Sequence, residues 1–510
     1  MLVLVIGLGT IAVRHADPYL HRRAVALLEE KFHSEVELRE FHAYLYPTLH
    51  LEGAGLALRK DGRKDVPPLI VIDKFSAEGS FSTLLTESWK IAQIKLQGLT
   101  ITIPPNDGRQ HREYAINKDI PIWVGDLISE NAKLIVLPKD PAKLPHEFDI
   151  HRLVMHSVGR NRAASFAATL TNATPPGEID TIGSFGPWNG DDPGQTPLDA
   201  GYTFDHADLG VFKGIGGILS SKGKFGGVLE RIEVAGETHT PDFVVDSGGH
   251  PVSLDTTFSA TVDGTNGNTI LHPVHAHFLN SYFTAAGPIV KTKTMAGRHI
   301  TLDVDFYRGR MEDLMSLAVK GDKPIMTGNM KFTAKFDLPS GKDENGDVTE
   351  RMNLAGKFGV GGAVFTDPEV REKLETLSRK AQGKPQDESE GSDVSELKGS
   401  FRMDNGTINF RNLAFKITGA NVQLDGSYGL KSEGLDFHGI LRMDARLSQT
   451  TTGVKSFFLK AVDPFFRKNG QTQIPIKISG TREKPSFGLD LHRGKESKKD
   501  GDKDNKNSRR

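Results

Sequence analysis

The sequence predicts a mainly β fold: a long twisted antiparallel sheet curled into an elongated apolar groove, with a few short helices. Three observations predict it. Apolar and polar residues alternate with a period of two over many segments, and turn-forming pairs such as Asn405-Gly406 separate those segments. No regular succession of strands and helices appears, which argues against a parallel doubly wound sheet. A set of β-sandwich domains is the alternative that the same alternation allows.

The composition is that of a globular protein. The 510 residues are 37% hydrophobic and include 54 glycines, enough to bury a core. Lys and Arg number 64 and Asp and Glu 65, so the charge balance gives no sign of a nucleic-acid-binding protein. Phenylalanine dominates the aromatic residues, with 28 against 8 tyrosines and 3 tryptophans, and it offers apolar contact without a polar group. Cysteine is absent, which excludes disulfides, Cys-ligated zinc and thiol chemistry.

The chain opens with an apolar segment, LVLVIGLGTIAV, at 2–13. As a helix this segment would measure only about 18 Å, against roughly 30 Å for a bilayer core. Arg14, Arg22 and Arg23 follow it and no basic residue precedes it, a distribution that by the positive-inside rule leaves the rest of the chain in the cytoplasm. We expect the remnant of an N-terminal membrane-anchor helix whose leading basic residues are missing. A cleaved signal peptide and a buried strand are the alternatives.

Helices are expected at four places. Asp17-Pro18 and Asp367-Pro368 are helix starts, because Asp caps the first turn and Pro suits its first position. Apolar residues at helical spacing then predict an amphipathic helix over about 18–32 and another over 367–381. The segments 311–319 and 453–462 are the other two candidates.

The clearest strand signal is LDFHGILRMDARL at 435–447, where apolar and polar residues occupy opposite faces. Segments 299–307, 331–338, 99–103 and 474–478 alternate in the same way. Hairpin turns are expected at Asn405-Gly406, Asp425-Gly426 and Asn345-Gly346. The apolar residues that we predict to line the groove are Ile300, Leu302, Val304, Phe306, Phe332, Phe336, Leu413, Phe415, Ile417, Leu435, Phe437, Leu441, Met443 and Leu447.

Two segments of the chain are polar and lack the alternation of a strand. Residues 382–396 have the composition of a linker, and residues 493–510 form a polar tail with eight basic and four acidic residues. We therefore expect an anchor and short helix over 1–33, a β body over 34–381, a C-terminal β module over 397–492 and a disordered tail. Contact of the tail with anionic lipid headgroups is the functional alternative to a merely solvated tail.

Motifs for phosphate loops and nucleophile elbows are absent from the sequence. The glycines of 214–227 fit turns and strand bends. HEFDIH at 146–151 misses the metalloprotease pattern by one residue and alternates like a strand. The acidic segment 186–209 is expected to be a turn-rich loop, since its carboxylates lack the spacing of a calcium loop.

ILHPVHAHF at 270–278 concentrates three histidines. In a strand, His275 and His277 share one face, while Val274, Ala276 and Phe278 share the other. A zinc site needs a third protein ligand, and no nearby residue offers one. We expect histidines on the wet face of a strand, Ile270, Val274, Ala276 and Phe278 on the apolar face, and neither a metal nor another cofactor.

Two longer segments near the C-terminus are GSFRMDNGTINFRNLAFKITGANVQLDGSYGLKSEGLDFHGILRMDARLS (399–448) and IPIKISGTREKPSFGLDL (474–491). The N-terminus combines the apolar segment, a helix ending in EEKF, a VEL strand and YPTLHLEGAGLAL. In these segments both ends of the chain resemble the AsmA-like family of Gram-negative envelope proteins. The anchor departs from the family pattern because it is short and no basic residue precedes it.

The resemblance implies an inner-membrane anchor, a body in the periplasm and a groove similar to that of chorein-type bridge-like lipid transfer proteins. The expected function is therefore non-enzymatic phospholipid binding and transfer in outer-membrane biogenesis. Expected partners are phospholipid acyl chains, the inner membrane and envelope proteins, with no nucleic acid. A non-conducting scaffold for assembly of outer-membrane proteins is the main alternative, and a metal-dependent hydrolase that uses His275 and His277 is a remote one.

Overall fold

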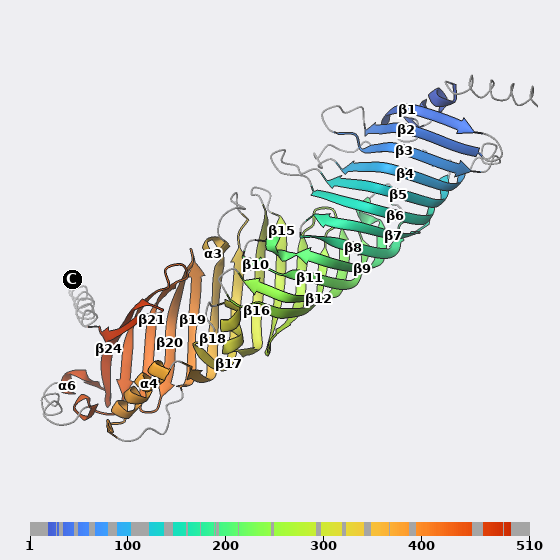
Figure 1. Cartoon of the computed structure of the whole chain (residues 1–510). Coiled ribbons are helices and arrows are strands. Elements are labelled where there is room, and N and C mark those ends of the chain that lie inside the picture. Colours follow the sequence, from blue (N-terminus) through green and yellow to red (C-terminus); the bar gives the residue numbers. More distant parts are fainter. Residues whose placement is uncertain are drawn as a thin grey trace, which may run out of the picture. The chain divides into compact units, whose positions relative to one another are not determined.

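The computed structural model confirms that the protein is mainly β, with 72% of the described residues in strands and only short helices among them (Figure 1). The strands belong to one mixed sheet. The structure describes residues 19–26, 28–29, 34–44, 49–60, 67–79, 89–103, 122–136, 146–159, 162–173, 175–187, 189, 193–212, 214–245, 249–291, 297–318, 323–340, 348–366, 368–386, 394–450, 463–482 and 484–490. The chain divides into two compact units: unit 1 comprises 1–212, 218–240 and 259–269, and unit 2 comprises 213–217, 241–258 and 270–510.

Unit 1 is a run of neighbouring strands in chain order. Its strands are β1 (Ser34–Tyr44), β2 (Leu49–Lys60), β3 (Ile70–Gly79), β4 (Trp89–Ile103), β5 (Ile122–Val136), β6 (His146–Gly159), β7 (Ala164–Ala173), β8 (Pro176–Phe185), β9 (Pro197–Asp208), β11 (Ile218–Val228) and most of β12 (Arg231–Val245). The short 3-10 turns η2 (Pro193–Gln195) and η3 (Leu209–Val211) flank β9. Strand β6 contains HEFDIH and thus confirms the strand expected there.

The expectation of a purely antiparallel sheet is wrong at one point. Strands β4 and β5 pair in parallel, with Trp89 opposite Ile122 and Ile103 opposite Val136. A parallel pair needs a crossover connection of about a dozen residues or more, and the segment 104–121 provides that length. All other pairings that we describe are antiparallel.

The core of unit 1 lies on one face of β1–β5. Leu38, Leu56, Ile72 and Leu99 are opposite one another on successive strands and are buried. Residues 19–26 and 28–29 are helical, in agreement with the amphipathic helix expected at 18–32, and Val25 and Leu28 pack against this core. The apolar segment 2–13 lies outside the described residues. No helix in the described ranges is long and apolar enough to span a membrane.

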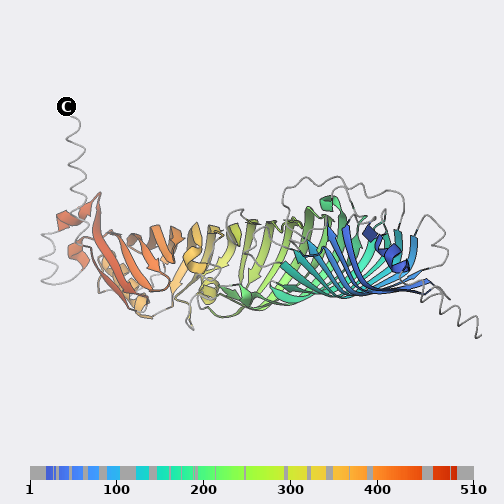
Figure 2. The ribbon, with the colours of Figure 1, turned by 90° about the horizontal axis from the view of Figure 1, so that it is seen from above.

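The strands of unit 2 are β10 (Ile215–Gly216), β13 (Val252–Val262, shared with unit 1), β14 (Thr269–Phe278), β15 (Ser281–Lys291), β16 (Arg298–Arg310), β17 (Met326–Leu338), β18 (Asn353–Phe365), β19 (Val394–Asp404), β20 (Thr407–Ile417), β21 (Ala420–Gly429), β22 (Gly434–Met443), β23 (Arg467–Lys468), β24 (Gln471–Thr481) and β25 (Pro485–Leu489). In unit 2, the strands from β15 to β22 form an antiparallel meander. Its helices and turns are α2 (Met311–Ala318), α3 (Val348–Arg351), α4 (Pro368–Ala381), η4 (Leu447–Thr450) and α6 (Asp463–Phe466). Figure 2, with the ribbon seen from above, shows the later strands of this set, β17 to β22 (yellow to orange), side by side in chain order.

Helices α2 and α4 confirm the helices expected at 311–319 and 367–381. Both connect strand ends at the same edge of the unit 2 sheet, because α2 follows Arg310 and precedes Met326, and α4 follows Phe365, which pairs with Met326. We call this edge the helix margin. In Figure 1, α3 lies at the opposite ends of the strands. The helix expected at 453–462 lies outside the described residues.

The hairpin signals have three different outcomes. Asn405 and Gly406 form the two-residue turn between β19 and β20, with φ of 46° and 68°, as a type I′ turn requires. Asp425-Gly426 is wrong as a turn, since both residues lie inside β21. Asn345-Gly346 lies outside the described residues, between the paired strands β17 and β18.

Three expected boundaries also change. Strand β22 ends at Met443, so Leu447 lies in η4 and not in the strand. The expected loop 186–209 contains strand β9 from Pro197, because Leu198, Ala200 and Phe204 pair with neighbouring strands on both sides. Residues 382–396 do not interrupt the sheet, since β18 pairs directly with β19.

Candidate functional site

The unit 2 sheet carries its apolar side chains on one face, which we call the apolar face. The strand registers align these side chains into rows that cross the strands. The central row is Val304, Ala334, Gly356, Phe401, Phe410, Gly426, Phe437, Ile478 and Phe487. The helix-side row is Met330, Val360, Leu397, Phe415, Val422, Leu441 and Ile474, and the far row is Leu302, Phe336, Leu354, Met403, Ile408, Tyr428 and Leu435.

Phenylalanine rings form a continuous chain of contacts along this face. The ring centroids of Phe283 and Phe306 are 4.6 Å apart with nearly parallel planes, and the next ring, Phe332, is 5.2 Å from Phe306. The other neighbouring pairs lie 5.7 to 6.3 Å apart. The eight rings, which we call the phenylalanine row, are Phe278, Phe283, Phe306, Phe332, Phe358, Phe401, Phe410 and Phe437. Each such pair contributes about 0.5–1.5 kcal/mol beyond the area that it buries.

Glycines opposite the phenylalanines make room for the rings. Gly426 of β21 is paired with Phe410 on one side and Phe437 on the other. A Cβ atom at Gly426 would lie 2.6 Å from Cδ1 of Phe437. The Phe437 ring therefore lies against the neighbouring backbone, which explains why the Asp425-Gly426 pair occurs within a strand.

The apolar face is only partly covered. Phe278, Phe306 and Phe437 are buried, but the rings of Phe283, Phe332, Phe358, Phe401 and Phe410 are half-buried. Soluble proteins rarely leave such a long row of aromatic side chains in contact with water. Because large apolar patches mark interaction sites, we infer that this face binds a partner or ligand.

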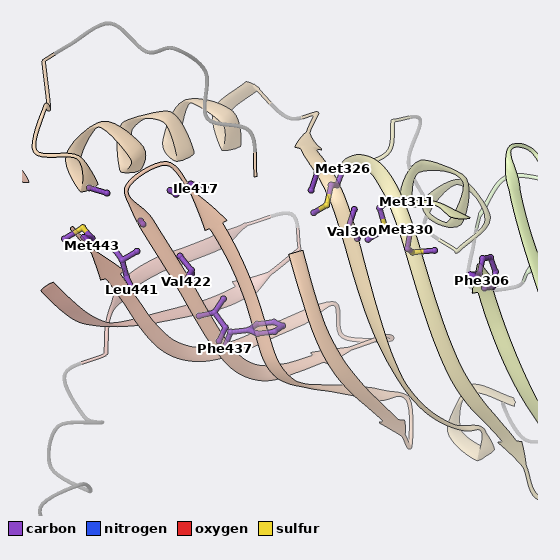
Figure 3. Packing of buried hydrophobic residues seen from close by; sticks show 14 of the residues in the cluster. Phe306, Met311, Met326, Met330, Val360, Ile417, Val422, Phe437, Leu441 and Met443 are labelled. Atoms are coloured by element: carbon purple, nitrogen blue, oxygen red, sulfur yellow. The ribbon is translucent and has the colours of Figure 1, made fainter. Parts of the chain in front are cut away.

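Helix α2 covers the helix margin over β16 and β17. Met311 is buried, and Leu314, Met315 and Leu317 pack against the core of the apolar face; Figure 3 shows Met311 beside Met326, Met330 and Val360. The carboxylate of Asp313 is buried and accepts hydrogen bonds from the backbone N–H of Asn280 (2.9 Å) and from Oγ of Ser281 (2.7 Å). These bonds attach the helix to the β14–β15 turn.

The neighbouring carboxyl of Glu312 is held in its charged form. Burial acts to raise its pKa, but the backbone N–H groups of Glu312 itself and of Gly328 and the guanidinium of Arg310 outweigh it and lower the pKa below its usual value. Nε of Arg310 donates to Oε1 at 2.7 Å and the N–H of Gly328 donates to Oε2 at 3.0 Å. In the far row, burial raises the pKa of the Tyr428 phenol, as expected for a hydroxyl in apolar surroundings.

Helix α4 covers the helix margin farther along the sheet. Leu374 and Leu377 pack against the core, and Ile417, Val422, Leu441 and Met443 lie on the same side of the strands as the helix (Figure 3). Oγ of Ser378 donates to the carbonyl of Thr418 at 2.9 Å, and the N–H of Ala445 donates to the carbonyl of Ala381 at 3.0 Å. Nζ of Lys373 lies 6.0 Å from the centroid of the Phe487 ring.

The predicted lining residues lie on this face, with one difference. Phe306, Ile417, Phe437, Leu441 and Met443 are buried members of its core. Val304, Phe332, Leu413, Phe415 and Leu435 pack against that core, and Ile300, Leu302 and Phe336 are half-buried toward the far side. Leu447 also packs against the core, but from η4.

Four members of the phenylalanine row were not among the predicted lining residues: Phe283, Phe358, Phe401 and Phe410. A signal existed in β19, where Leu397, Phe401 and Met403 alternate with polar residues. In β18 the alternation is harder to see, because Gly356 occupies one apolar-face position.

The histidine-rich segment forms strand β14, as expected. Ala276 and Phe278 are buried, whereas His275 is exposed. The ring of His277 stacks on Tyr282 at 4.4 Å, and its Nε2 lies 2.8 Å from the carbonyl oxygen of Leu279. Ile270 is 51% exposed, so the apolar side of this strand is less covered at its start than at Phe278.

Within the ranges that the structure describes, no group of three or more His, Asp or Glu side chains is arranged to hold a metal ion. No protein-family model matches the chain, and no curated protein or solved structure shows significant similarity to it.

Proposed function

We propose that this protein binds phospholipid acyl chains along the apolar face of unit 2, in a sheet curled into a groove. In this proposal it is a non-enzymatic, membrane-anchored lipid-transfer protein of the periplasm that acts in outer-membrane biogenesis. The observation that carries the proposal is the phenylalanine row, which is continuous across the strands and half-buried over most of its length.

The energetics favour an acyl chain as occupant. Each CH₂ group removed from water stabilises the complex by about 0.8 kcal/mol. The central row crosses nine strands from β16 to β25, and at about 4.8 Å per strand it extends over roughly 40 Å. Its side chains offer no charged group, so an alkyl chain can lie against them at many positions while its polar headgroup stays in water.

The resemblance of both chain ends to AsmA-like proteins supports the same proposal and its place in the envelope. The alternation of residues in β17 also supports the proposal. Lys331, Thr333 and Lys335 lie on the opposite face of the sheet from the phenylalanine rings. Water would therefore contact one face of the sheet and an apolar ligand the other.

A photocrosslinking experiment tests the proposal. Benzoylphenylalanine is placed at Phe332 or Phe401, and the matched control carries it at Lys331, the exposed neighbour of Phe332. Cells that produce each variant are irradiated, the protein is purified in mild detergent, and adducts are identified by mass spectrometry. We expect phospholipid adducts at 332 and 401 and few at 331.

Two results would contradict the proposal. Equal lipid adducts at all three positions would indicate non-specific contact with detergent or membrane. Protein adducts without lipid at 332 and 401 would favour the scaffold alternative. A binding assay with a fluorescent fatty acid adds an independent readout. Phe332→Ser with Phe401→Ser should weaken binding by about tenfold or more, because each substitution removes an aromatic ring against which the alkyl chain would lie.

A further inference from the structure

The last described strand, β25, presents apolar side chains to the outside. All five of its residues are exposed. Phe487 is 58% and Leu489 61% exposed, and both point to the apolar face, because they pair with Ile478 and Ile476. The apolar face therefore ends at a sheet edge with two large uncovered side chains.

This exposure belongs to a strand that is attached at both ends. At its start, the N–H of Thr481 donates to the carbonyl of Lys484, and the N–H of Lys484 donates back to the carbonyl of Thr481 at 3.1 Å. At its end, the N–H of Asp490 donates to the carbonyl of Pro475 at 3.1 Å. The carboxylate of Asp490 is buried and lies 2.7 Å from Nδ1 of His438. Phe487 and Leu489 are thus held outward.

The outer edge of β1, the first strand of unit 1, is covered by side chains of the preceding helical segment, in contrast to the edge at β25. Nε2 of His21 lies 2.9 Å from the carbonyl oxygen of Leu38 in β1, and the carboxylate of Glu29 accepts a long hydrogen bond from the N–H of Val36 at 3.5 Å. The helical segment of unit 1 thus occupies backbone groups of β1 that another strand would need. No described element does this for β25.

Basic residues outnumber acidic ones in the sequence after the exposed residues. Arg482 pairs with Glu433 at 3.0 Å, but Lys484 precedes Phe487, and residues 493–510 contain eight basic and four acidic residues. Nζ of Lys373 lies 6.0 Å from the Phe487 ring centroid. Exposed apolar side chains beside an excess of basic residues are the combination that binds an anionic lipid surface.

We propose that β25 is a docking surface for an anionic lipid bilayer, with Phe487 and Leu489 inserted among the headgroups. The apolar face would then open toward the membrane at this edge. The docking itself does not depend on acyl-chain binding by the phenylalanine row, so either proposal can fail without the other.

The test uses the absence of cysteine from the chain. Ser486→Cys is labelled with a polarity-sensitive dye in the full-length protein, and Ser165→Cys, an exposed position in β7, is the control. Vesicles of phosphatidylcholine, alone or mixed with phosphatidylglycerol, are added. We expect a blue shift at position 486 with the anionic vesicles only, and none at position 165. High salt should weaken the effect.

Two variants identify the groups responsible. Phe487→Ser with Leu489→Ser should raise the lipid concentration for half-maximal shift by about tenfold. The tail variant Lys498→Gln, Lys499→Gln, Arg509→Gln, Arg510→Gln removes the tail's excess of basic residues and should have a similar effect. Ile182→Ser, which removes an apolar side chain 72% exposed in unit 1, should have none. Circular dichroism checks that each variant is folded.

Three results would overturn the proposal: no shift at 486, an equal shift at 165, or a shift that survives in both variants. A shift at 486 without vesicles that grows with protein concentration would also overturn it. That result would instead assign the edge to pairing with a second copy of the chain.

Discussion

Replacing Gly426 by alanine tests whether the phenylalanine rings lie against the neighbouring backbone. A Cβ atom at this position would be 2.4 Å from the carbonyl oxygen of Asp436 and 2.6 Å from both Cα and Cδ1 of Phe437. These distances are far shorter than a van der Waals contact, and two of the three atoms belong to the backbone. Strand β22 would have to move, at a cost of about 1–3 kcal/mol for an overpacked core position.

Gly359 of β18 is a matched control, because it lies in the same sheet and an added Cβ atom would meet nothing within 4 Å. Gly359→Ala should be neutral or stabilise the protein by up to about 1 kcal/mol, since alanine restricts the unfolded chain. The two variants should therefore differ by about 1–4 kcal/mol in the free energy of unfolding.

Native-state hydrogen exchange is the suitable assay, because it reports on β21 and β22 directly even if the two units unfold separately. In Gly426→Ala, the amides of β21 and β22 should exchange roughly 5- to 150-fold faster, which corresponds to the expected destabilisation. Urea unfolding followed by circular dichroism gives a second readout. Equal protection of these strands in both variants would refute the packing that we infer between Gly426 and Phe437.

Two further predictions concern α2. The lowered pKa of Glu312 means that its contribution to stability is present above the usual carboxyl pKa and is lost as the pH falls through the folded-state value. Glu312→Gln should therefore lower the thermal midpoint at neutral pH, and the difference from the parent protein should shrink in acid; a pH-independent difference would contradict this reasoning. Asp313→Ala should cost about 1–3 kcal/mol, because it leaves Ser281 Oγ and the Asn280 N–H without their buried acceptor. Asp303→Ala, at an exposed position of β16, should be nearly neutral in urea unfolding, and equal effects of the two substitutions would argue against a role for the buried bonds.

Local patterns predicted individual elements well. Asp367-Pro368 predicted the start of α4 because capping and proline geometry act within one helical turn. Asn405-Gly406 predicted a hairpin because both residues tolerate positive φ. Asp425-Gly426 carries a similar local signal, yet it lies in a strand. Gly426 pairs with Phe410 and Phe437 of the two neighbouring strands, and we infer that packing of these rings keeps it in the strand. A turn pattern of four consecutive residues contains no information about those strands.

The sequence by itself determined which side chains share a face, because alternation along a strand follows from the two-residue period of the extended backbone. It therefore placed Phe332 with Phe336 and Phe437 with Leu441. Only the tertiary structure decided that Phe332, Phe358, Phe401 and Phe410 lie in one row, that β4 and β5 run parallel, and that α2 and α4 cover one margin of the apolar face. The physical reason is that strand register and helix position depend on pairing and packing between segments far apart in the chain, which no local pattern encodes.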